Sequence, residues 1–177
     1  MKRAVAAALI ASALALTGCV NIPDTYAPPV QRHPVAGPDT SRLKHFIAMN
    51  DPAAEDHFLA DIGPLEGGAW RWTRQNPTLR FVLPTTKGLK FVTDFSLSSD
   101  TMKVTGPITI NYFVNGHPLD SVRYEKAGEQ HFEKPVPAEW LNEGQDIVVK
   151  LALDKVYVAP GDGAKLGVTI VRAGFAE

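Results

Sequence analysis

Five stretches of the chain place their apolar residues with a period of two, and this pattern limits the possible fold more than any other feature. Successive side chains of a strand point to opposite faces of a sheet, so each stretch predicts a strand with one buried face. The buried positions predicted in this way are Leu79, Phe81 and Leu83; Leu89, Phe91, Thr93, Phe95 and Leu97; Ile108, Ile110, Tyr112 and Val114; Ile147, Val149, Leu151 and Leu153; and Leu166, Val168 and Ile170. A shift of one residue in any strand would turn its whole apolar set out of the core.

Turn signals separate these predicted strands. Asn115-Gly116 is a strong hairpin signal, and Pro77, Gly88, Gly106-Pro107 and Gly144 stand at other joints. Short strands with turns of this kind predict an all-β fold, an antiparallel β-sandwich over residues 63–177.

One short helix is expected before the strands, over residues 45–62. Asp51 can cap free backbone amides and Pro52 suits the first helical position. Phe58, Leu59 and Ile62 would then give the helix an apolar edge that covers part of the sandwich.

The chain start predicts a secretory signal over residues 1–18. Lys2 and Arg3 precede an apolar run, residues 4–16, that is too short to span a bilayer of roughly 30 Å as a helix. Leu16-Thr17-Gly18-Cys19 resembles the lipobox of bacterial lipoproteins. This resemblance implies cleavage before Cys19 and acyl chains on that residue, which would anchor the protein in a membrane. The alternative is a plain signal peptide followed by a buried or free cysteine.

Residues 19–44 predict a tether behind the lipidated cysteine. Prolines recur through this segment, and they restrict the backbone to extended conformations that could reach about 60 Å from the membrane. The residue after Cys19 is Val20 and not aspartate, which resembles the sorting of lipoproteins to the outer membrane. The expected location is therefore the cell envelope, at the outer membrane.

Composition excludes several classes of function. The chain has 18 Lys and Arg against 19 Asp and Glu, without a basic stripe, so we expect no nucleic-acid partner. Cys19 is the single cysteine, so the chain can form no internal disulfide and offers no thiolate cluster for a metal. We expect no cofactor.

The candidate ligand-binding residues are Glu66, Trp70, Arg71, Trp72 and Arg74. The tryptophans lie two positions apart, so both indoles face the same side of a strand. There they could stack on a sugar ring while Arg71 or Arg74 forms hydrogen bonds to hydroxyl groups. Alternatively both indoles fill the sandwich core or its rim, which we favour because large aromatic side chains dominate core burial. Glu66 could accept hydrogen bonds from hydroxyl groups, or it could cap a turn by binding backbone amides.

No catalytic motif is present, and we expect no enzyme activity. The sequence lacks a nucleophile elbow, a His-Glu-x-x-His helix, a phosphate-binding glycine loop and a Cys-His pair. The five histidines are scattered and are expected at the surface or in turns. Asp154 and Asp162 lie in an oxygen-rich loop that suits calcium but equally suits ordinary turns. A pair of carboxylates for glycoside hydrolysis stays open, because its separation is spatial.

A broader resemblance covers most of residues 56–175. Its motifs are Phe58-Leu59, Gly63, Glu66, Trp70-Arg71-Trp72-Thr73, Leu79, Leu83-Pro84, Val114-Asn115-Gly116, Val136-Pro137 and Leu166-Gly167. Together they resemble β-sandwich modules of bacterial cell-envelope polysaccharide proteins, which implies a jelly-roll or galactose-binding-like fold. The hypothesis that follows is a lipid-anchored envelope module without catalytic activity that contacts a glycan or polysaccharide. The alternatives are a protein-interaction subunit of an envelope export or assembly complex and, less favoured, a hydrolase.

Overall fold

The computed structural model describes residues 42–177, which lie in one compact unit, Gly37–Glu177. The strands are β1 (Phe46–Ala48), β2 (Phe58–Glu66), β3 (Trp70–Val82), β4 (Lys90–Leu97), β5 (Ile108–Val114), β6 (His117–Tyr124), β7 (Gly128–Pro135), β8 (Asp146–Leu153), β9 (Tyr157–Val158), β10 (Lys165–Leu166) and β11 (Thr169–Ala176). The predicted signal peptide, Cys19 and nearly all of the predicted tether fall outside the described residues. Within residues 42–177, no helix has the length and apolar character needed to cross a membrane.

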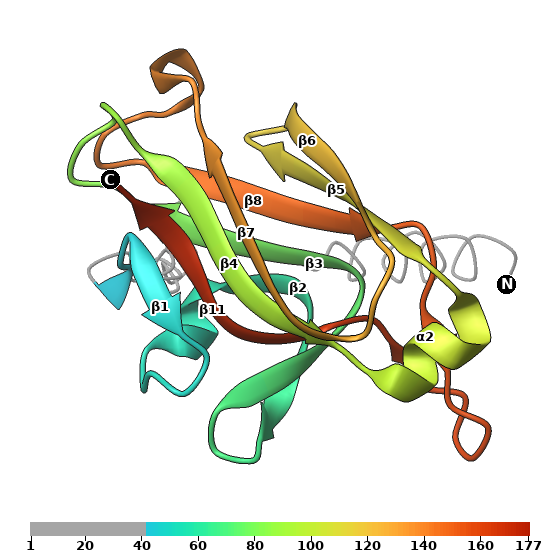
Figure 1. The fold of residues 1–177 in the computed structure, drawn as a ribbon. Coiled ribbons are helices and arrows are strands. Elements are labelled where there is room, and N and C mark those ends of the chain that lie inside the picture. Colours follow the sequence, from blue (N-terminus) through green and yellow to red (C-terminus); the bar gives the residue numbers. More distant parts are fainter. Residues whose placement is uncertain (1–41) are drawn as a thin grey trace, which may run out of the picture. The chain divides into compact units, whose positions relative to one another are not determined.

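The long strand β3 connects the two layers of an antiparallel β-sandwich. The main strands follow the order β6-β5-β8-β3-β11-β4-β7. The start of β3 pairs with β11 through Arg71 and Trp72, whereas its end, from Thr78 to Val82, pairs with β8. One layer therefore contains β5, β6 and β8, and the other contains β4, β7 and β11. In Figure 1 the strands β4 and β7 of the second layer pass in front of β3 and β8. The predicted fold class is confirmed.

Aromatic side chains join the two layers in the core. Tyr112 of β5 stacks on Phe132 of β7, with ring centroids 3.6 Å apart and planes at 4°. Phe95 of β4 meets Tyr124 of β6 edge to face at 5.2 Å. The hydroxyl groups of Tyr112 and Tyr124 lie 2.7 Å apart, so each buried hydroxyl has a polar partner. Burial raises the pKa of Tyr112, which keeps the phenol neutral.

The predicted hairpin at Asn115-Gly116 is confirmed and also fastens neighbouring segments. Both residues have positive φ, 48° and 81°, as the tight turn between β5 and β6 requires. The Asn115 side-chain amide donates to the carbonyl of Trp140, and its oxygen accepts from the backbone N–H of Val148, each at 2.8 Å. One side chain therefore links the hairpin tip to β8 and to the loop before it.

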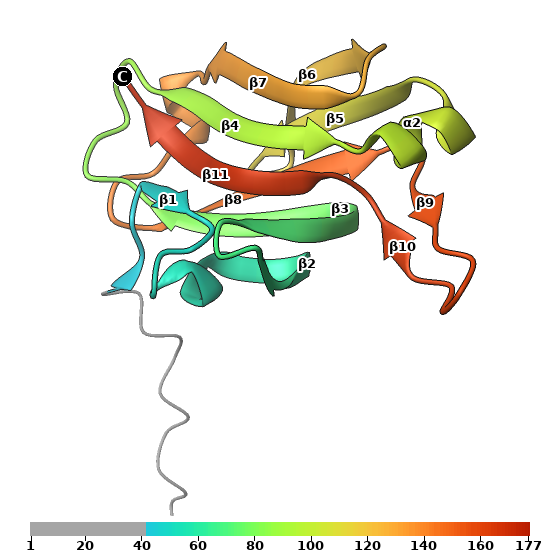
Figure 2. The ribbon, with the colours of Figure 1, turned by 60° about the horizontal axis from the view of Figure 1, so that its bottom comes forward.

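The helix expected over residues 45–62 is wrong in extent. Only Ala54–His57 form a helix, a 3-10 turn called η2, and the next nine residues form β2 (Figure 2). Asp51 does accept from the N–H of Ala53, at 2.8 Å. A helix this short is marginal in isolation, whereas pairing with β3 satisfies the backbone of β2 along the strand.

His57 is fully buried, which corrects the expectation that every histidine lies at the surface or in a turn. Its Nδ1 lies 2.7 Å from the carbonyl of Arg80, and its Nε2 accepts from the backbone N–H of Lys44 at 3.2 Å. Since Nε2 accepts here, the ring is neutral in this arrangement. Burial lowers the pKa of His57.

Two helical segments connect strands elsewhere. The helix α2 (Ser99–Thr105) was not predicted; Ser98 caps its start by accepting from the N–H of Asp100. The turn expected near residues 137–141 is present as the 3-10 helix η3 (Ala138–Trp140). Leu141 is buried behind it, whereas Trp140 is only partly buried and stacks on His117 at 4.9 Å.

Candidate functional site

The turn between β2 and β3 positions the two candidate tryptophans. Gly67 and Gly68 adopt φ of 56° and 69°, a region that glycine enters without steric cost, and this lets β3 return beside β2 from Trp70 onward. Trp70 and Trp72 then point to the same side of β3, and both indoles are partly exposed. Their ring centroids lie 5.9 Å apart and their planes meet at 89°. Neither indole fills the core.

Arg71 points to the opposite side of β3 and is 6% exposed. Its Nε donates to the carbonyl of Met49 at 3.1 Å, and its Nη1 donates to the carbonyl of Gly63 at 3.2 Å. The guanidinium also lies 4.9 Å from the ring centroid of Phe58 and pairs with Glu55 at 3.4 Å. Arg71 therefore holds the segment before η2 and the middle of β2 against β3, and it does not face the tryptophans.

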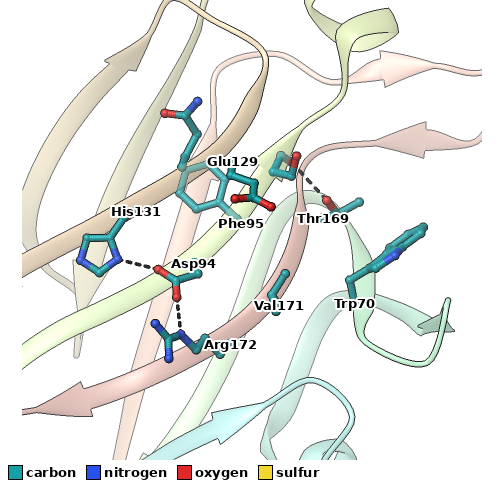
Figure 3. A pocket seen from close by; sticks show the side chains of 10 residues that line it. Trp70, Asp94, Phe95, Glu129, His131, Thr169, Val171 and Arg172 are labelled. Carbon is teal, nitrogen blue, oxygen red and sulfur yellow. Dashed lines mark hydrogen bonds and ion pairs between the residues drawn. The ribbon is translucent and has the colours of Figure 1, made fainter.

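A hollow of about 780 Å³ lies beside Trp70 on the outer face of β11, β4 and β7. The sheet register sets two rows of side chains across it. One row is Thr169, Ser96 and Glu129, and the other is Arg172, Asp94 and His131. In Figure 3 Trp70 stands on one side and His131 on the other, with Val171 and Asp94 between them.

Asp94 is the centre of an ion network on this face. Its carboxylate accepts from Nδ1 of His131 at 2.5 Å and from Nε of Arg172. His131 also faces Glu133 at 3.6 Å, and Glu133 pairs with Lys90 at 3.1 Å. Partial burial by itself raises the pKa of Asp94, but the hydrogen bonds from His131 and Arg172 outweigh it and hold this pKa below its ordinary value. Asp94 is therefore ionised and held in place at the surface of this hollow.

A second hollow of about 390 Å³ lies on the other side of the tryptophan pair. Glu66, Trp72 and Arg74 line it together with Lys165 from β10. The backbone keeps β10 close to β3, because the N–H of Gly167 donates to the carbonyl of Thr73 at 2.8 Å. This hollow combines one carboxylate, two cations and an indole.

The two aspartates of the oxygen-rich loop accept hydrogen bonds from backbone N–H groups, one on β5 and one within the loop. Asp154 accepts from the N–H of Thr109 at 2.8 Å, and Asp162 accepts from the N–H of Ala164 at 3.0 Å. Within residues 42–177, no group of three or more His, Cys, Asp or Glu side chains is arranged to hold a metal ion.

The structure thus divides the five predicted ligand-binding residues. Glu66, Trp72 and Arg74 meet in the smaller hollow, Trp70 lines the larger one, and Arg71 lines neither. Sequence reasoning missed the polar residues of the larger hollow, which are Asp94, Ser96, Glu129, Gln130, His131, Thr169 and Arg172. The signal for Asp94 and Ser96 was their place on the polar side of the strand over residues 89–97. That they meet His131 and Arg172 depends on strand pairing, which the alternation does not specify.

No protein-family model matches the chain, and no curated protein sequence matches it. The chain is similar in structure to a family 35 carbohydrate-binding module from an environmental isolate, with 9% identity and a TM-score of 0.44 over 68% of this chain and 87% of that one. It is also similar to the CBM36-1 domain of a multidomain xylanase from the hindgut metagenome of Trinervitermes trinervoides, with 11% identity and a TM-score of 0.44 over 75% and 95% of the two chains. A family 35 module from Clostridium thermocellum has 14% identity and a TM-score of 0.41 over 75% and 98%.

Proposed function

We propose that the protein is a non-catalytic glycan-binding module of a bacterial cell envelope, anchored in a membrane by lipid on Cys19. The observation that carries the binding proposal is the partly exposed indole of Trp70 on the wall of a hollow of about 780 Å³. A sugar ring has an apolar C–H face, which suits an indole, and an edge of hydroxyl groups, which needs hydrogen-bond partners. Ser96, Thr169 and Glu129 line the same hollow and supply such partners.

The hydrogen bonds of Asp94 make it unsuited to the role of the acid in glycoside hydrolysis. Glycoside hydrolysis by two carboxyl groups requires one of them to be protonated so that it can act as the acid. Asp94 and Glu129 are the two carboxylates that line the larger hollow. Because its hydrogen bonds to His131 and Arg172 lower the pKa of Asp94, this group stays ionised and donates no proton.

Affinity electrophoresis of the full-length protein in gels that contain a soluble polysaccharide tests the proposal. The panel covers xylan, mixed-linkage glucan, galactan, dextran and envelope polysaccharide. We expect at least one polysaccharide to retard the protein, and Trp70→Ala to weaken that binding about tenfold, which corresponds to roughly 1.4 kcal/mol. Trp140→Ala is the matched control, since Trp140 lines neither hollow.

Two results would contradict the glycan proposal. The first is migration unaffected by every polysaccharide of the panel. The second is retardation of a folded Trp70→Ala protein equal to that of the wild type, with folding checked by the urea midpoint of unfolding.

One feature favours the alternative function of a protein-interaction subunit. Leu59 and Leu65 are 49% and 39% exposed on β2, which pairs only with β3 among residues 42–177. However, three register irregularities interrupt β2, and such bulges discourage the addition of another strand. Crosslinking in cells that recovers one stoichiometric protein partner, and loses it in Leu59→Lys, would support the subunit function instead.

Lipid anchoring is proposed from the sequence pattern alone, Leu16-Thr17-Gly18-Cys19. Each buried methylene contributes about 0.8 kcal/mol, so two or three acyl chains hold a protein firmly. We expect the wild type to incorporate labelled palmitate and to sediment with outer membranes, and Cys19→Ser to do neither. A Cys19→Ser protein that remains equally membrane-bound would contradict the anchor.

A further inference from the structure

We propose that the two hollows act as one groove that binds a linear glycan along its length, with Trp70 and Trp72 in contact with different rings of the same chain. This inference rests on the proposed glycan-binding function and adds the form of the ligand. It concerns a polysaccharide chain that crosses β3, and not a single sugar or a chain end held in one hollow.

Each hollow has one member of the tryptophan pair in its lining. Trp70 lines the larger hollow and Trp72 lines the smaller one, while their rings lie only 5.9 Å apart between centroids. Trp72 is also paired across the strands with Thr169, which lines the larger hollow. A ligand that leaves one hollow over β3 therefore enters the other without crossing any further strand.

The angle between the indoles shows why one sugar ring cannot use both of them. Stacking requires the ring of the sugar to lie parallel to the aromatic plane, and the two indole planes meet at 89°. A sugar ring parallel to one indole is therefore perpendicular to the other. Both indoles can stack only if two rings of one chain present their faces in different directions.

Polar groups extend along the same path on both sides of the indole pair. On one side Glu129, Ser96 and Thr169 line the larger hollow, and on the other Glu66 and Arg74 line the smaller hollow. Hydroxyl groups of successive rings thus have partners on either side of β3. A short fragment that fills one hollow leaves the partners in the other without sugar contacts.

Isothermal titration with oligosaccharides of increasing length tests this inference. The probes are the disaccharide to the hexasaccharide prepared from the polysaccharide that retards the full-length protein. We expect affinity to increase with length until both hollows are occupied. Trp72→Ala should then weaken hexasaccharide binding about tenfold, roughly 1.4 kcal/mol, and abolish the gain with length. Trp140→Ala should leave the increase of affinity with oligosaccharide length unchanged.

The outcomes separate this inference from the proposed function. Equal affinity for the disaccharide and the hexasaccharide, or unchanged hexasaccharide binding by a folded Trp72→Ala protein, overturns the continuous groove and leaves glycan binding intact. Failure of every polysaccharide to bind overturns both.

Discussion

Replacing Arg71 by methionine is expected to weaken the fold and to leave glycan binding unchanged. Methionine keeps much of the side-chain volume and removes the charged donors. The carbonyls of Met49 and Gly63 then lose the hydrogen bonds that they accept from the guanidinium at 3.1 and 3.2 Å. Because Arg71 is 6% exposed, water cannot easily replace these bonds.

The size of the effect follows from these contacts. A hydrogen bond from a charged donor contributes roughly 1.5–3 kcal/mol, so two of them dominate. The ion pair with Glu55 adds little, since that carboxylate is 77% exposed and screened by water. The substitution also removes the cost of keeping a charge away from water, and this offsets part of the lost hydrogen-bond energy. The net destabilisation expected is about 3 kcal/mol. For a domain of this size, that corresponds to a melting temperature lower by roughly 10 °C.

Urea unfolding followed by tryptophan fluorescence measures this loss. We expect a lower midpoint with an unchanged slope for Arg71→Met, and a change within about 0.5 kcal/mol for the control Arg74→Met, whose side chain is exposed. An Arg71→Met protein that unfolds at the wild-type midpoint would refute the structural role. Loss of polysaccharide binding at unchanged stability would instead mean that Arg71 reaches the ligand.

Three further perturbations examine other parts of the fold. Burial lowers the pKa of His57, so the unfolded chain binds a proton on this ring more readily than the folded protein does. The urea midpoint should therefore fall as pH decreases below about 6.5, and His57→Gln should remove the part of this pH dependence that comes from His57. Gly174→Ala should cost about 1–3 kcal/mol, because a Cβ there would overlap Phe46 at a φ of 152°; Gly161→Ala, which meets no atom within 4 Å, should cost far less in the same assay. Asn115→Ala should lower the thermal midpoint by an amount equivalent to about 2 kcal/mol, since two hydrogen bonds at 2.8 Å and the left-handed turn preference are lost; an unchanged midpoint would contradict the linking role of that side chain.

The sequence by itself determined the strands β3, β4, β5 and β8 and the hairpin after β5, because these depend on local rules. Alternation from Leu89 to Leu97 reports the pleat of one strand, and Asn115-Gly116 reports the positive φ of one turn. The same period of two correctly predicted that Trp70 and Trp72 face one side of β3. None of these features needs a partner elsewhere in the chain to be recognised.

The tertiary structure decided which side chains meet, because strand pairing joins residues far apart in sequence. Asp94 reaches Arg172 and His131 only through the registers of β4 with β11 and β7. Pairing with β3 made Phe58–Glu66 a strand, against the local helix signal. The two tryptophans share a face, yet packing of β10 and β11 against β3 assigns them to different hollows. A period of two orients a side chain, whereas the register of neighbouring strands determines what it contacts.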